Sequence, residues 1–153
     1  MSVKKFRFRL ERVLSLKTTL KKQAQKALAE AENVKRKQQG ILISLNDELS
    51  GRMAQEKSRR TKRLDLGRLE LAQKYFGQLA LLIAHQTKVL KEAEAKVVHK
   101  RKKLLEASKE VKKFEKLKEI RKDEYTRELE LMLQKETDEF AKNVHRFNSQ
   151  SPQ

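Results

Sequence analysis

The chain of 153 residues contains no cysteine and no tryptophan, and its single proline stands at position 152. Without cysteine, neither a disulfide framework nor a thiolate metal site can form. Because proline breaks helices, residues 1–151 are free to form very long ones. Four scattered glycines form neither a GxGxxG nor a GxxxxGK[ST] phosphate-binding loop.

Long apolar runs are also missing. The longest uncharged stretch, residues 75–87, is too short to cross a bilayer. Basic residues interrupt the apolar residues 6–20, so this segment does not read as a signal peptide. Aromatic residues make up only 5% of the chain. We therefore expect no membrane span, no thick globular core and a cytoplasmic location.

Charge is abundant and strongly basic. Charged residues make up 39% of the chain, and the net charge is +17. A basic surface attracts nucleic acid, anionic lipid or an acidic protein. The runs at residues 59–63 and 100–103 could contact phosphates, but little aromatic surface is free for base stacking. We expect no nucleic-acid partner, and keep a basic coiled-coil protein bound to RNA, DNA or the ribosome as an alternative.

The dominant pattern is a heptad repeat, in which apolar residues recur alternately four and three positions apart. In the first half the two columns are Phe6, Val13, Leu20, Ala27, Val34, Ile41 and Leu10, Lys17, Ala24, Ala31, Gln38, Leu45. In the second half they are Phe76, Ile83, Leu90, Val97, Leu104, Val111 and Ala72, Leu79, Gln86, Ala93, Lys100, Ala107, Phe114. This spacing places each set on one stripe of a helix that packs against another helix.

The expected fold is all-α, a long antiparallel two-helix coiled-coil hairpin forming a single domain, 1–153. We predict helices over about 4–60 and 66–146, a turn at about 61–66 and a disordered tail, 148–153. Ser58, Thr61 and Asp65 are candidate caps. Pairing Phe6 with Phe114 gives mostly apolar layers, although a slip of one heptad matches nearly as well.

The second helix should extend past the first and keep an apolar stripe. Its residues are Tyr125, Leu129, Leu133, Phe140, Val144 and Phe147. An uncovered stripe indicates an interaction site, with dimerisation or partial cover by the N-terminus as the alternatives.

Catalytic and cofactor sites are not indicated. A hairpin lacks the rigid pocket that a nucleophile and base require. His85, His99 and His145 lie too far apart for one helical metal site. We expect no enzymatic activity, no metal and no cofactor.

Three stretches resemble the flagellar FliJ family. They are Phe6-Arg7-Phe8-Arg9-Leu10-Glu11-Arg12-Val13-Leu14; Tyr75-Phe76-Gly77-Gln78-Leu79, continuing to Ile83 and Gln86; and Leu117-Lys118-Glu119, Tyr125, Glu128, Gln134-Lys135-Glu136 and Asp138-Glu139. The resemblance implies a hairpin similar to the central stalk of rotary ATPases, working at the cytoplasmic face of the inner membrane in flagellar type III export. It also implies three partners: the hexameric flagellar export ATPase, the cytoplasmic domain of the export-gate membrane protein, and export chaperones. A stalk subunit of a rotary ATPase is the other alternative.

The resemblance also implies two sets of binding residues. The ATPase-ring set is Phe6, Phe8, Arg9, Leu10, Arg12, Val13, Tyr125, Leu129 and Leu133. The export-gate set is Gln38, Leu42, Leu45, Leu49, Tyr75, Leu79, Leu82 and Gln86.

Overall fold

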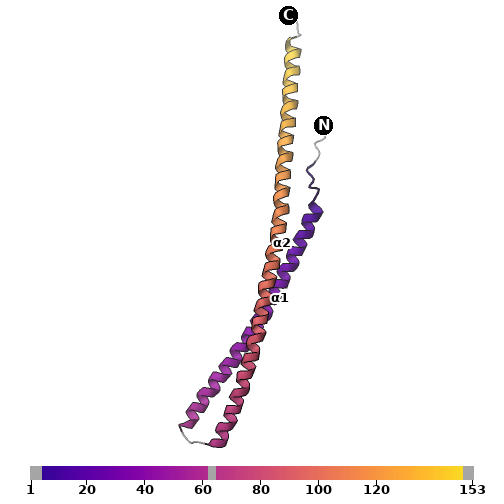
Figure 1. Cartoon of the computed structure of the whole chain (residues 1–153). Helices are drawn as coiled ribbons and strands as arrows, with labels where there is room; N and C mark the ends of the chain where they lie inside the picture. Colours follow the sequence, from indigo (N-terminus) through magenta and orange to yellow (C-terminus); the bar gives the residue numbers. More distant parts are fainter. Residues whose placement is uncertain (1–4, 62–64, 150–153) are drawn as a thin grey trace. The chain divides into compact units, whose positions relative to one another are not determined.

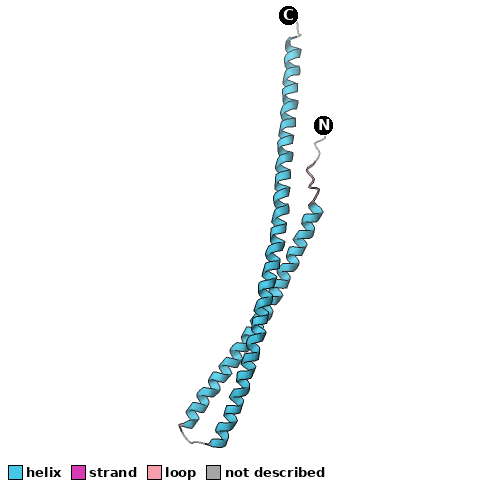
Figure 2. Cartoon of the chain, in the orientation of Figure 1, coloured by secondary structure: helices cyan, strands magenta, loops and turns pink. Residues whose placement is uncertain are grey.

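The computed structural model describes residues 5–61 and 65–149 of the chain. Two helices account for nearly all of them, α1 (Glu11–Arg60) and α2 (Leu66–Ser149) (Figure 1). Figure 2 shows no strand in this described part of the chain. The predicted all-α fold, with two long helices packed against each other, is confirmed.

The helix ends differ from the predicted bounds. α1 begins at Glu11 and not near residue 4, and the Glu11 amide donates to the Phe8 carbonyl at 3.2 Å. Basic side chains are unfavourable at the positive end of the helix dipole, and an acidic one is favourable. Arg7 and Arg9 therefore disfavour an earlier start, whereas Glu11 in the first turn stabilises this one.

At the other end, α2 runs to Ser149, so residues 148 and 149 of the expected disordered tail are helical. The rest of that tail, residues 150–153, lies outside the described residues, as do residues 62–64 of the expected turn.

Both helices contribute to two compact units. The hairpin unit is Leu20–Ala107, and the end unit is the described part of Met1–Thr19 and Ser108–Gln153. In the end unit, Glu11 pairs with Lys118 and Lys17 with Glu110, which sets α1 antiparallel to α2. In the hairpin unit the two helices also run antiparallel (Figure 1).

The predicted seam of α2 is confirmed. Every residue of its two columns is buried or half-buried. The most buried apolar side chains are Leu79, Ala93, Val97 and Val111. Removing such side chains from water is the main favourable term in the packing of the two helices.

The predicted seam of α1 is half right. In the column that begins with Leu10, Leu10 itself is exposed, and the other members are half-buried as predicted: Lys17, Ala24, Ala31, Gln38 and Leu45. In the other column, however, Leu20, Val34 and Ile41 are exposed. The residues one position later are half-buried in their place: Lys21, Leu28, Lys35, Leu42 and Leu49. This shift buries three leucines, while lysine stems can cover apolar surface with the ammonium group in water.

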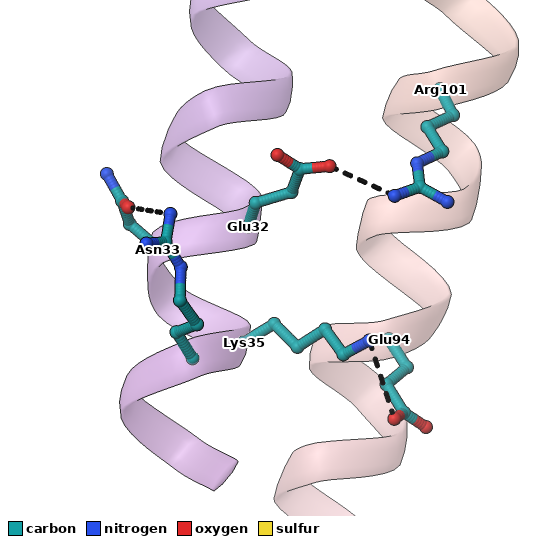
Figure 3. A network of polar contacts seen from close by, with 6 residues as sticks. Glu32, Asn33, Lys35, Glu94 and Arg101 are labelled. Carbon is teal, nitrogen blue, oxygen red and sulfur yellow. Dashed lines mark hydrogen bonds and ion pairs between the residues drawn. The ribbon is translucent and has the colours of Figure 1, made fainter. Parts of the chain in front are cut away.

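Ion pairs cross the edge of this seam. In the hairpin unit, Arg101 Nη2 lies 3.1 Å from Glu32 Oε1, and Lys35 Nζ lies 3.9 Å from Glu94 Oε1 (Figure 3). Beside them, Arg36 donates to Asn33 within α1. Because these groups are partly exposed, each pair contributes about 0–1 kcal/mol. The pairs therefore add little to the stability of the hairpin unit, and their main effect is to favour one relative orientation of the two helices.

The predicted register is wrong. It pairs Phe6 with Phe114 and would set Gln86 beside Val34, where the amide has no polar partner. Instead, the buried Gln86 amide donates to Gln38 Oε1 at 2.7 Å and to the Gln38 carbonyl at 3.0 Å. An unpaired buried amide costs about 1–3 kcal/mol, so the register that joins the two glutamines is favoured.

We expect Gln86→Leu to lower the free energy of unfolding by about 1 kcal/mol, because it leaves the Gln38 amide without its partner in a largely apolar seam. The double variant Gln38→Leu/Gln86→Leu should recover that loss, since both polar groups are then replaced by apolar ones. Urea unfolding followed by circular dichroism measures both. A double variant less stable than Gln86→Leu would contradict this account.

The start of α2 is capped by Asp65, as predicted. Asp65 Oδ1 accepts hydrogen bonds from the amides of Gly67 at 3.1 Å and Arg68 at 3.3 Å. Thr61 serves the other helix, because its hydroxyl donates to the Ser58 carbonyl at 2.7 Å, in the last turn of α1. Both residues thus satisfy backbone groups that helix ends leave unpaired.

Asp65→Ala is expected to lower the free energy of unfolding by about 1 kcal/mol, because two amides lose their acceptor. Asp65→Asn keeps an acceptor oxygen and should lose only a few tenths of this. Thermal unfolding of the two variants distinguishes them, and equal losses would show that the cap is not the cause.

Candidate docking surfaces

The last turns of α2 present an uncovered apolar stripe in the end unit. All described residues from 130 to 149 are exposed. The stripe consists of Leu133, Phe140, Val144 and Phe147. Their spacing of seven, four and three residues places them on one helical face. Phe140 and Phe147 are 71% and 80% exposed, so the expected apolar overhang is present from Leu133 onwards, whereas Tyr125 and Leu129 of the predicted stripe are half-buried.

The N-terminal segment covers an earlier part of the same helix. The Phe6 ring packs on the Tyr125 ring, with centroids 5.6 Å apart and planes tilted by 48°. Phe8 is also half-buried. A groove of about 790 Å³ remains between residues 5–10 and the side chains of Leu117, Arg121 and Tyr125. An ion pair of 2.8 Å between Glu11 and Lys118 fixes the position where the segment enters α1.

The structure therefore brings most of the predicted ATPase-ring set together in the end unit. Phe6, Phe8, Arg9 and Leu10 line one groove with Tyr125. Val13 and Leu129 are half-buried, whereas Arg12 and Leu133 are exposed. The sequence pattern did not show that Phe6 and Tyr125 contact each other, because that contact depends on residues 5–10 being outside the helix.

The predicted export-gate set lies in the hairpin unit, and most of it belongs to the seam. Leu79 is 3% exposed and Gln86 is held by Gln38, while Leu82 is 53% exposed. The other members are half-buried: Gln38, Leu42, Leu45, Leu49 and Tyr75. Leu82 is the member of the set that offers a partner the most apolar surface. Leu81, which the sequence analysis did not single out, is also exposed.

Tyr75 is held by two charged side chains of α1. Its hydroxyl donates to Glu48 Oε1, and the Arg52 guanidinium carbon lies 5.6 Å from the ring centroid. The hydrogen bond to the Glu48 carboxylate raises the pKa of the Tyr75 phenol above its usual value. The ring is thereby fixed beside Phe76, whose centroid lies 6.4 Å away.

Other kinds of site are not present in residues 5–61 and 65–149. Neither helix contains an apolar stretch of the length needed to cross a membrane. No three His, Cys, Asp or Glu side chains are grouped so that they could hold a metal ion.

Two antiparallel helices with uncovered apolar faces define a coiled-coil protein that offers surfaces for docking. The family model described as flagellar FliJ protein matches residues 6–150. The chain therefore belongs to the flagellar FliJ family, which confirms the resemblance of the three sequence stretches and makes it a component of flagellar type III export.

The chain is also similar to the solved structure of a YscO homolog from Chlamydia trachomatis. The two are 18% identical, the match covers 97% of this chain and 100% of the other, and the TM-score is 0.49. No curated protein matches the chain.

Proposed function

We propose that this chain is a non-enzymatic stalk and adaptor of the flagellar export apparatus. Its end unit enters the ring of the hexameric export ATPase and promotes ring assembly and turnover. Its hairpin unit docks on the cytoplasmic domain of the export-gate membrane protein, and other surface contacts export chaperones. In this role the chain works peripherally, at the cytoplasmic face of the inner membrane.

The observation that carries this proposal is the uncovered stripe of Leu133, Phe140, Val144 and Phe147. An exposed apolar face on a single helix is costly in water and becomes favourable when a partner covers it. A ring with a central opening can surround one helix on all sides. Phe6 and Tyr125 contact each other at the start of this region. In this proposal they bind at the entrance of the central opening of the ring.

Docking on the export gate is supported by different residues. Leu82 exposes most of its side chain, and Tyr75 is held in place by Glu48 and Arg52. The seam members of the gate set, such as Leu79, are buried between α1 and α2 and hold the two helices together beneath this surface. The net charge of +17 of the whole chain suits salt-sensitive docking on an acidic surface.

A titration of the full chain into the purified flagellar export ATPase of the same organism tests the proposal. We expect phosphate release to rise and reach a plateau, and no hydrolysis by the chain alone. An unchanged rate across the titration would overturn the assignment to the ATPase ring.

A further inference from the structure

We propose that the turn-side end of the hairpin unit is a binding groove for one acidic amphipathic α-helix of a partner protein. This surface shares only Tyr75 with the proposed export-gate set. It shares no residue with the stripe on the end of α2 and does not depend on binding to the ATPase.

α1 and α2 diverge towards the end of α1 and the start of α2 (Figure 1). Side chains of both helices line a groove there. Its volume is about 520 Å³. The α1 side is lined by Arg52, Gln55, Glu56 and Arg59, and the α2 side by Arg68, Leu71, Ala72, Lys74, Tyr75, Phe76 and Gln78. The groove is therefore open to solvent between two walls, with apolar side chains on the α2 wall.

Seam residues become more exposed towards this end. Leu79 is 3% exposed, whereas Phe76 and Ala72, which precede it in the α2 seam, are only half-buried. Beside the seam, the groove residue Leu71 is 70% exposed. The two helices thus leave apolar side chains here that neither helix covers, and such surface favours a partner.

The charge around the groove selects the partner. Four basic residues line it, namely Arg52, Arg59, Arg68 and Lys74. Glu56 is the one acidic residue among the described lining residues, and it is paired with Arg59 at 3.3 Å. Lys74 is paired with Glu70, also at 3.3 Å. The positive charge that remains, on Arg52 and Arg68, is complementary to Asp and Glu side chains.

A helix suits this groove better than other acidic partners. Two diverging helices can take a third helix between them, because helix axes pack about 8–10 Å apart. A helix pairs its own backbone groups, so its apolar face can enter the groove while acidic flanks meet the basic residues. A flat anionic bilayer would meet the basic rim but would not reach the recessed Ala72 and Phe76.

The test uses the full chain and two labelled synthetic peptides of about 18 residues, or about five helical turns. Both share a leucine face, and their flanks carry either glutamate or lysine. Fluorescence anisotropy at about 0.15 M salt measures binding. We expect saturable binding of the acidic peptide, at least about tenfold tighter than that of the basic one.

Two exposed substitutions should each weaken that binding at least about tenfold. Leu71→Asp removes apolar lining, and Arg68→Glu removes a cation from the first turn of α2, where an acidic residue is favourable to the helix. Leu131→Asp and Lys113→Glu make the same changes at exposed sites of the end unit and should change affinity less than about twofold.

Three results would each overturn the proposal. The first is no saturable binding of the acidic peptide. The second is equal loss in the groove and control variants, which would show general attraction to a basic chain. The third is binding to phosphatidylserine vesicles that depends on Leu71 and Arg68 without binding of the acidic peptide, which would assign the groove to a membrane.

Discussion

The double variant Phe140→Asp/Phe147→Asp is expected to abolish stimulation of the export ATPase. These rings are 71% and 80% exposed in the chain, so a partner that surrounds α2 buries more new surface on them than on smaller side chains. Aromatic anchors of this kind each contribute about 2 kcal/mol or more to binding. Losing both corresponds to roughly a thousandfold weaker association. The measurement is phosphate release as a function of chain concentration.

The matched control is Leu131→Asp/His145→Asp. Both residues are exposed on α2, and Leu131 lies nine residues before Phe140, which places it on the opposite helical face. The control introduces the same two carboxylates into the exposed part of α2 beyond residue 129. It should retain at least about half of the stimulation. Equal loss in the two double variants would show that any added negative charge near the end of α2 disrupts binding. The stripe would then not be the docking surface.

Neither double variant should change the stability of the chain. Surface substitutions away from caps and buried groups usually change the free energy of unfolding by about 0.5 kcal/mol or less. Thermal unfolding of both variants therefore checks that lost stimulation reflects lost docking.

The α2 seam could be predicted from the sequence because its phase is unambiguous. Large apolar residues such as Leu79, Leu90 and Val111 recur in one register, and no competing stripe offers as much apolar surface. The Asp65 cap could also be predicted, because capping depends on a local spacing of two to three residues.

The α1 seam could not be fixed in the same way, because two stripes compete. Leu20, Val34 and Ile41 form one column, and Leu28, Leu42 and Leu49 form another one position later. The spacing of four and three residues fits either column. The choice depends on how the side chains pack against α2, which the sequence of α1 does not contain.

The register and the helix start were missed for physical reasons that involve polar groups. Apolar matching alone scores neighbouring registers almost equally, whereas the Gln38–Gln86 hydrogen bonds separate them. The heptad pattern continues through Phe6 and Leu10, so it predicts helix there. The signal against it was the basic charge of Arg7 and Arg9 at the end of a helix dipole.

The groove at the turn-side end of the hairpin unit was harder to predict from the sequence than the seam. Leu71, which lines the groove, is apolar but falls outside the predicted columns. An apolar residue out of phase with the seam cannot be buried by the partner helix, and it indicates a second face. The candidate docking residues therefore depend on which side chains the seam leaves exposed, and this is known only once the packing is known.

Leu79 and Leu82 provide a direct way to separate packing from docking in the hairpin unit. Leu79→Ala is expected to lower the free energy of unfolding by about 2–4 kcal/mol, because a side chain that is 3% exposed is replaced by a cavity. Leu82→Ala, at a side chain that is 53% exposed, should lower it by less than about 1 kcal/mol. Urea unfolding measures both changes.

The same pair tests the proposed gate surface. If Leu82 contacts the export gate, Leu82→Ala weakens binding to the purified cytoplasmic gate domain by roughly tenfold while the chain keeps its stability. Weaker binding in Leu79→Ala alone, with Leu82→Ala unchanged, would mean that the buried leucine acts only through the packing of α1 against α2. The gate surface would then have to be sought among other exposed residues, of which Leu81 is adjacent and exposed on α2.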